Sequence, residues 1–152
     1  MSNKPIEVMA RGVLVRRGRL LVCQGRGADN VYLPGGHVEF GEAAVTALAR
    51  EWREELGVRV KVGCFLGAVE HTYRQKGLVH CEVNFVFVVT CPALSSAANP
   101  TSGEDWIKFS WISLDGLAAA HLEPQPLCRQ LPRWLAAVRG VSACWASTLP
   151  TA

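Results

Sequence analysis

The 152-residue sequence lacks the features of several large protein classes. No apolar run approaches the ~20 residues that a membrane-spanning helix needs. The first ten residues lack the basic start and the apolar core of a signal peptide. We therefore expect a cytoplasmic protein with no membrane partner.

Cysteine is present but is not arranged as ligands or bridges. No two cysteines form a CxxC pair, so the spacing that is typical of zinc sites is absent. We interpret the cysteines as small hydrophobic residues of the core in a reducing compartment, where a disulfide framework is not expected. They are Cys23, Cys64, Cys81, Cys91, Cys128 and Cys144.

Two common phosphate-binding motifs are also missing. Gly35 and Gly36 are not followed by GKS or GKT, so they are not part of a Walker loop, and no GxGxxG fingerprint occurs. A formal net charge of +3, without clustering, favours a small polyanionic substrate over a nucleic-acid polymer. With 49% hydrophobic and 19% charged residues, the chain is expected to form one globular domain.

Apolar patterns predict several strands. Residues 13–15 and 20–24 are expected to form a hairpin, and "VYLPGG" a short extended segment. The runs "VRVKVGCFLGAVE", "VHCEVNFVFVVTC" and "WIKFSWISL" are rich in β-branched and aromatic residues and predict three more strands. Residues 92–103 have the composition of a loop. "PLCRQLPRWLAAV" predicts a helix in which Pro132 either causes a kink or begins a second helix. This order indicates a mixed sheet flanked by helices.

A further helix is predicted between Gly41 and Gly57, because apolar residues recur there at three- and four-residue spacing. They are Val45, Leu48, Ala49, Trp52 and Leu56. On a helical projection we place Glu51, Glu54 and Glu55 within about 100° of one another, on the side away from this stripe.

Three converging carboxylates repel one another unless a cation lies among them, and a set of oxygen ligands suits Mg²⁺ or Mn²⁺. Arg50, four residues before Glu54, can brace one carboxylate without taking the place of the ion. Gly35 and Gly36 lack a Cβ atom, which allows a backbone carbonyl to approach the same ion.

The segment "GHVEFGEAAVTALAREWREELGV", residues 36–58, resembles a complete Nudix box. That pattern is Gly, five residues, Glu, seven residues, then Arg-Glu-apolar-any-Glu-Glu-any-Gly-apolar. Every fixed position is present, namely Gly36, Glu42, Arg50, Glu51, Glu54, Glu55 and Gly57. Trp52 stands where the family more often has an aliphatic residue. The chain is thus similar to the Nudix (MutT-like) hydrolases.

The resemblance implies an α/β fold, a Nudix-like α/β/α sandwich with a mixed sheet in a single domain. We assign residues 1–140 to the domain and 141–152 to a C-terminal tail of uncertain order. The family's activity is hydrolysis of a nucleoside diphosphate linked to another group, with Mg²⁺ or Mn²⁺ as cofactor. Its metal ligands would be Glu51, Glu54, Glu55 and the carbonyl of Gly35.

The resemblance also assigns supporting residues. Arg50 would orient the glutamates, and Gly36 and Glu42 would lie behind the ligands without touching the metal. The residue that accepts the proton of the attacking water varies across the family. A glutamate of the box, Glu51 or Glu54, is one candidate, and Glu82 and Glu104 are alternatives.

Substrate identity is less constrained. Relatives that hydrolyse ADP-ribose tend to carry a proline shortly after the box, and none occurs between Val58 and Cys91, which disfavours ADP-ribose. Signatures for NADH or coenzyme A hydrolysis are not visible. Tyr73 lies roughly where dinucleoside-polyphosphate hydrolases place a base-stacking tyrosine, which makes it a candidate substrate-binding residue.

An alternative function is a non-catalytic Nudix domain that senses a nucleotide-like ligand. Such domains usually have an eroded box, whereas this box is intact, which favours the enzyme. A small-molecule nucleotide is the expected partner in both cases, and a homodimer is compatible with the sequence.

Overall fold

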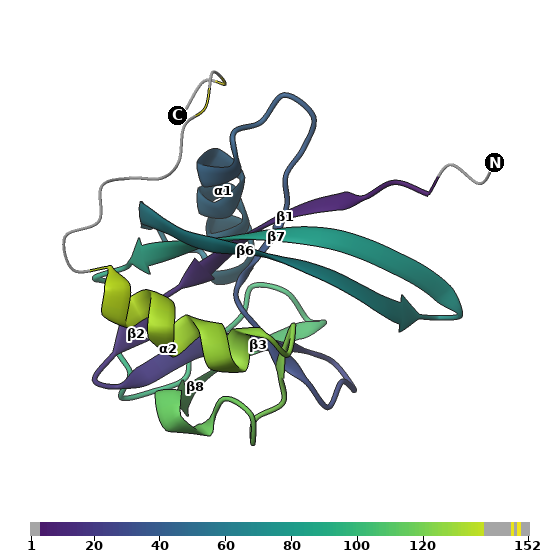
Figure 1. Ribbon diagram of the computed structural model, residues 1–152. Coiled ribbons are helices and arrows are strands. Elements are labelled where there is room, and N and C mark those ends of the chain that lie inside the picture. The colour runs from purple at the N-terminus through teal and green to yellow at the C-terminus, as the bar shows by residue number, and fades with distance from the viewer. Residues whose placement is uncertain (1–3, 139–146, 148, 150–152) are drawn as a thin grey trace.

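The computed structural model describes residues 4–138, 147 and 149, and its strands form two sheets (Figure 1). The helices are α1 (Ala44–Leu56) and α2 (Leu127–Ala137), and a 3₁₀ turn spans Leu114–Gly116. The strands are β1 (Glu7–Val13), β2 (Val15–Arg16), β3 (Arg19–Gly25), β4 (Val31–Tyr32), β5 (Gly35–His37), β6 (Lys61–Gln75), β7 (Leu78–Thr90), β8 (Ile107–Ser113) and β9 (Leu122–Glu123).

The first sheet has the strand order β5-β1-β7-β6. Strand β1 runs antiparallel to β5 and parallel to β7, so the sheet is mixed as the sequence predicts. The second sheet has the order β2-β3-β4-β9, and β8 pairs with β3. The β2–β3 hairpin is confirmed, although the residues before it form β1 in the other sheet.

The two helices lie on opposite sides of the strands, which makes the fold an α/β/α sandwich (Figure 1). Helix α1 buries Leu48 and Trp52 in a core cluster that includes Ala10 of β1 and Phe87 of β7. On the other side, Leu127 of α2 belongs to a second cluster with apolar residues of both sheets. The expected fold class is therefore confirmed.

Of the cysteines expected in the core, Cys23 and Cys91 are buried, but the expectation is wrong for Cys81, which is exposed. The remaining elements agree with the pattern of the sequence. Residues 92–103 form an irregular loop, as predicted. Helix α2 continues through Pro132, so no second helix begins there. No helix in the described part of the chain has the length and hydropathy of a membrane span. The tail assigned to 141–152 lies outside the described residues, apart from positions 147 and 149.

Helix α1 ends where the sequence predicts, at Gly57, which adopts φ 66° and donates its N–H to the carbonyl of Arg53 at 2.9 Å. Trp52 is fully buried, as expected. The predicted position of Glu55 on the solvent side is wrong, because this residue is only 6% exposed. Glu55 follows Leu48 by about two full helical turns and therefore shares its buried face.

Candidate active site

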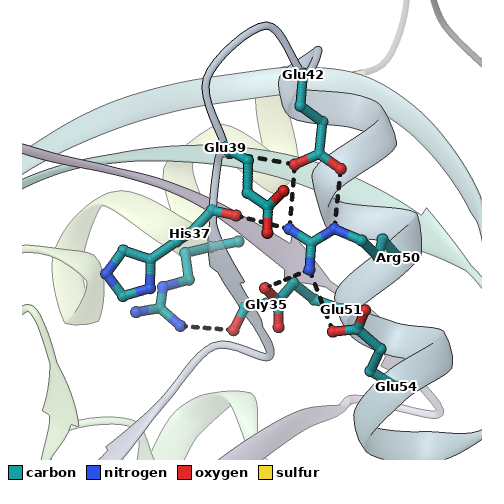
Figure 2. Close-up of polar contacts among 8 residues, drawn as sticks. Gly35, His37, Glu39, Glu42, Arg50, Glu51 and Glu54 are labelled. Atoms are coloured by element: carbon teal, nitrogen blue, oxygen red, sulfur yellow. Dashed lines mark hydrogen bonds and ion pairs between the residues drawn. The ribbon is translucent and has the colours of Figure 1, made fainter.

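Arg50 is the centre of the polar contacts around α1 (Figure 2). Its guanidinium donates two hydrogen bonds to the Glu42 carboxylate, from Nε at 2.9 Å and from Nη2 at 3.1 Å. Nη1 reaches Glu51 at 2.9 Å and Glu54 at 3.2 Å. Nη2 also donates to the carbonyl of His37 at 3.0 Å. One arginine thus contacts three carboxylates, those of Glu42, Glu51 and Glu54, whereas its spacing to Glu54 alone predicted that it would brace one.

The hydrogen bonds between Arg50 and Glu42 stabilise the charged forms of both groups. They lower the pKa of Glu42 and raise the pKa of Arg50. Both carboxylate oxygens of Glu42 accept a hydrogen bond from Arg50, so Glu42 fixes the orientation of the guanidinium. The place of Glu42 behind the metal ligands stays a prediction.

Gly35 and Gly36 bring the backbone of β5 against β1 and α1. Gly35 adopts φ 138°, and a Cβ atom there would collide with the carbonyl of Ala10. A Cβ atom on Gly36 would collide with the carboxylate of Glu51. The absence of a side chain at Gly36 therefore leaves room for the Glu51 carboxylate directly over the strand.

Glu55 is a buried carboxylate whose Oε2 atom has no hydrogen-bond partner in the structure. Burial, with a further contribution from the charge of Glu51, raises the pKa of Glu55 to about 7. The positive charge of Arg11 acts in the opposite direction and lowers this pKa. A buried carboxylate oxygen without a partner is costly unless a ligand or cation satisfies it.

The residues present fit a divalent metal ion. The donors are carboxylate and carbonyl oxygens, which Mg²⁺ and Mn²⁺ prefer, and Glu55 Oε2 has no hydrogen-bond partner, so it is free to bind an ion. As arranged in the described residues, however, no three His, Cys, Asp or Glu side chains form a ready cluster for a metal. Glu51 and Glu54 are turned toward Arg50 instead, so metal binding would require these side chains to adjust.

The loop before β8 reaches the C-terminal end of α1. The N–H of Gly103 donates to the carbonyl of Glu55 at 2.7 Å, and Ser102 Oγ donates to the same oxygen at 3.4 Å. Glu104 follows directly, and its charge contributes to raising the pKa of Glu55. The structure therefore brings Glu104 to the neighbourhood of the box, where it stays a candidate proton acceptor.

Glu82 lies on the face of β7 that points away from α1, together with Asn84. It is 5% exposed, and its Oε1 accepts a hydrogen bond from Asn84 Nδ2 at 2.9 Å. Asn84 Oδ1 in turn accepts from Arg11 Nε at 3.1 Å, and Arg11 Nη1 donates to the Gly35 carbonyl at 3.1 Å. A chain of buried hydrogen bonds thus links Glu82 to the carbonyl that was predicted to bind metal.

Tyr73 lies on β6 with its ring stacked against two histidines. The ring centroids are 5.4 Å from His71 and 4.9 Å from His80. His80 Nδ1 lies 3.0 Å from Glu7 Oε1, and this contact lowers the pKa of Glu7. The stacked rings lie on the hairpin of β6 and β7, whose far end projects beyond the rest of the domain (Figure 1).

Sequence reasoning missed Arg11 and the role of Asn84. Arg11 stands in the run "VMARGVLV", where a charged side chain interrupts an otherwise apolar strand. The same signal made Glu82 a candidate, so it could have identified Arg11 as well. Asn84 carries no charge, and only its position two residues after Glu82 on the same strand face indicates a polar role.

The chain is similar to a known protein family and to several of its members. A family model described as NUDIX domain matches residues 7–134. An isopentenyl-diphosphate Delta-isomerase from Cereibacter sphaeroides (strain ATCC 17025 / ATH 2.4.3) is 34% identical over 119 residues, covering 72% of this chain and 65% of the isomerase. A MutT-like protein from Streptomyces ambofaciens is 36% identical over 117 residues, covering 76% of this chain and 70% of that protein.

Among solved structures, the crystal structure of a MutT NUDIX hydrolase from Burkholderia pseudomallei is 29% identical, with a TM-score of 0.62. The match covers 89% of this chain and 99% of that one. The chain described here spans 65% of the length of the isomerase, which is less than two thirds of that relative.

Proposed function

The chain belongs to the NUDIX domain family, and we propose that it is a metal-dependent hydrolase that cleaves a phosphoanhydride bond in a nucleoside diphosphate linked to another group. The observation that carries the proposal is the carboxylate set of α1. Arg50 orients Glu51 and Glu54, while Glu55 presents a buried oxygen without a partner beside them. The similarity to a MutT NUDIX hydrolase supports the same reaction class.

Glu51, Glu54, Glu55 and the Gly35 carbonyl would hold Mg²⁺ or Mn²⁺. The chemistry that such an ion supplies when bound is charge neutralisation on the phosphate oxygens and activation of water for in-line attack. Arg50 keeps the carboxylates oriented and compensates their mutual repulsion. Gly36 leaves the space that the Glu51 carboxylate occupies.

A glutamate of the box is the proposed proton acceptor, with Glu82 as the alternative. Glu54 supports this assignment, because its side chain is 54% exposed and only one of its oxygens accepts a hydrogen bond, from Arg50. Glu82 is buried and already paired with Asn84, which hinders access of a water molecule. Glu104 is exposed on the neighbouring loop and remains a second alternative.

The nucleotide moiety of the substrate is assigned to Tyr73. Tyr73 is proposed to contact the base, in which case a base would have to join or displace the stack with His71 and His80. A relative is named as an isopentenyl-diphosphate isomerase, so a diphosphate without a nucleoside belongs in any substrate test.

The test is product analysis from a panel of substrates with Mg²⁺, with Mn²⁺ and with EDTA. The panel contains nucleoside triphosphates, ADP-ribose, dinucleoside polyphosphates, NADH, coenzyme A and isopentenyl diphosphate. We expect metal-dependent release of a phosphate-containing product from at least one nucleotide, and no product from Glu54→Gln under the same conditions. Tight nucleotide binding without turnover of any compound would instead favour the non-catalytic sensor.

A cytoplasmic location and a homodimer are further parts of the proposal. Light scattering of the purified chain would decide between a monomer and the homodimer.

A further inference from the structure

Arg11 is a buried cation whose hydrogen-bond acceptors are all neutral, although its charge also lowers the pKa of the Glu55 carboxyl. It is 9% exposed, and its guanidinium donates to Asn84 Oδ1 at 3.1 Å, to the Leu33 carbonyl at 3.3 Å and to the Gly35 carbonyl at 3.1 Å. Its guanidinium carbon also lies 5.2 Å from the centroid of the Tyr32 ring. Within the described residues, Arg11 takes part in no salt bridge.

Burial of this charge is costly. Charged side chains are almost never fully buried unless they are paired, because removal from water is costly. Carbonyl oxygens hold a guanidinium in place but do not neutralise it. The neighbouring positions on the same face of β1 are Met9 and Val13, which are both buried and apolar, so an apolar residue at position 11 would continue the pattern of this face. The charge is therefore better explained by a ligand than by the fold.

The position of Arg11 indicates what the ligand is. The Gly35 carbonyl accepts a hydrogen bond from Arg11 and is also a proposed metal ligand. Two cations that share one oxygen repel each other, and an anion that lies beside both offsets this repulsion. The substrate proposed above supplies such an anion, and the planar fork of a guanidinium matches phosphate oxygens.

We propose that Arg11 binds a phosphate group of the substrate next to the metal site. The inference rests on the proposed function for the identity of this ligand. Asn84 and Glu82 are positioning residues for Arg11. Glu82 accepts from the Asn84 amide nitrogen, which turns the amide oxygen toward Arg11 Nε. Both side chains are buried, so the guanidinium is held in one orientation before the substrate arrives.

Two measurements on Arg11→Gln test the proposal, and neither requires turnover. The first is the Mn²⁺ affinity without nucleotide, measured by electron paramagnetic resonance. We expect it to increase, by about tenfold, because a positive charge beside the metal ligand is removed. The second is calorimetric binding of methylenediphosphonate to the Mn²⁺-saturated protein. We expect this affinity to fall by about tenfold or more, because charge-assisted hydrogen bonds are lost.

The expected changes in the two affinities have opposite signs, and this distinguishes a role in ligand binding from a role in the fold. If Arg11 only supported the fold, both affinities would fall together, and that result would overturn the proposal. Unchanged affinity for methylenediphosphonate would also overturn it. If Arg11→Gln does not fold, the same two affinities are measured on Arg11→Met, which keeps the side-chain volume.

Arg16→Gln is the matched control, since Arg16 also donates to a carbonyl, that of Cys91 at 2.9 Å, but lies on β2 of the second sheet. We expect wild-type affinities for Mn²⁺ and for methylenediphosphonate in this variant. The proposed hydrolysis can fail independently of this inference. If Arg11→Gln changes both affinities as expected and no nucleotide is cleaved, the phosphate site stands and the proposed function does not.

Discussion

Removing the charge of Glu55 is expected to stabilise the metal-free protein, and the gain should grow with pH. Burial raises the pKa of this carboxyl from 4.5 to about 7, so the folded state binds the proton more tightly than the unfolded state. The contribution of Glu55 to stability is therefore fully present below about pH 4.5 and is lost as the pH rises through about 7. The loss amounts to about 3 kcal/mol.

The assay is urea denaturation in EDTA at a series of pH values from about 5 to 8, for the wild type and Glu55→Gln. Glutamine does not titrate, so the difference between the two free energies of unfolding isolates Glu55. Glu42 has a lowered pKa and loses its stabilising contribution as the pH falls, but it does so in both proteins and cancels in the difference.

Glu54→Gln serves as the control, because the Glu54 side chain is 54% exposed. We expect its stability difference from the wild type to change little with pH. Saturating Mn²⁺ should reverse the order and make the wild type more stable than Glu55→Gln, since the ion binds the folded state. A difference between wild type and Glu55→Gln that stays flat across this pH range would refute the reasoning.

Four further outcomes are expected. Glu54→Gln should lower turnover by orders of magnitude at limiting Mg²⁺ with little change in melting temperature, and wild-type turnover would exclude Glu54 as a ligand. Trp52→Ala should cost about 3 to 5 kcal/mol in urea denaturation, because it leaves a cavity beneath α1, whereas an unchanged midpoint would contradict the packing. Gly36→Ala should weaken Mn²⁺ binding in titrations, since the new methyl group displaces the Glu51 carboxylate; unchanged affinity would contradict this. Glu82→Gln keeps an acceptor for Asn84 and should retain most of kcat, while loss of the acidic limb of the pH–rate profile would make Glu82 the proton acceptor.

Local patterns in the sequence were sufficient to predict helix α1 and the β2–β3 hairpin. Helix α1 was predicted because its apolar residues repeat with the helical period and Gly57 supplies the left-handed residue that ends it. The β2–β3 hairpin was predicted from two apolar runs, and its turn residues Arg17 and Gly18 both adopt positive φ, as a two-residue hairpin turn requires.

The strand order and the contacts of Arg11 could not be predicted, because they depend on pairing between strands that are far apart in the sequence. No local pattern shows that β1 lies between β5 and β7, and without this order Arg11 has no visible connection to Gly35 or Asn84. The error at Glu55 has a different origin. The helical projection grouped Glu55 with Glu51 and Glu54 on the side away from the apolar stripe, although Glu55 lies at the edge of that group. Its spacing of seven residues from Leu48 puts it next to the stripe and therefore in the core.

The parallel pairing of β1 with β7 also bears on how the protein folds. Arg11 meets Asn84, which lies 73 residues further along the chain, so this contact closes a long loop before it contributes any stability. The β2–β3 and β6–β7 hairpins close short loops and can form early. During synthesis, β1 therefore leaves the ribosome long before its parallel neighbour exists. We expect docking of β1 onto β7 to limit the folding rate, so the Arg11 site would be assembled only in that late step.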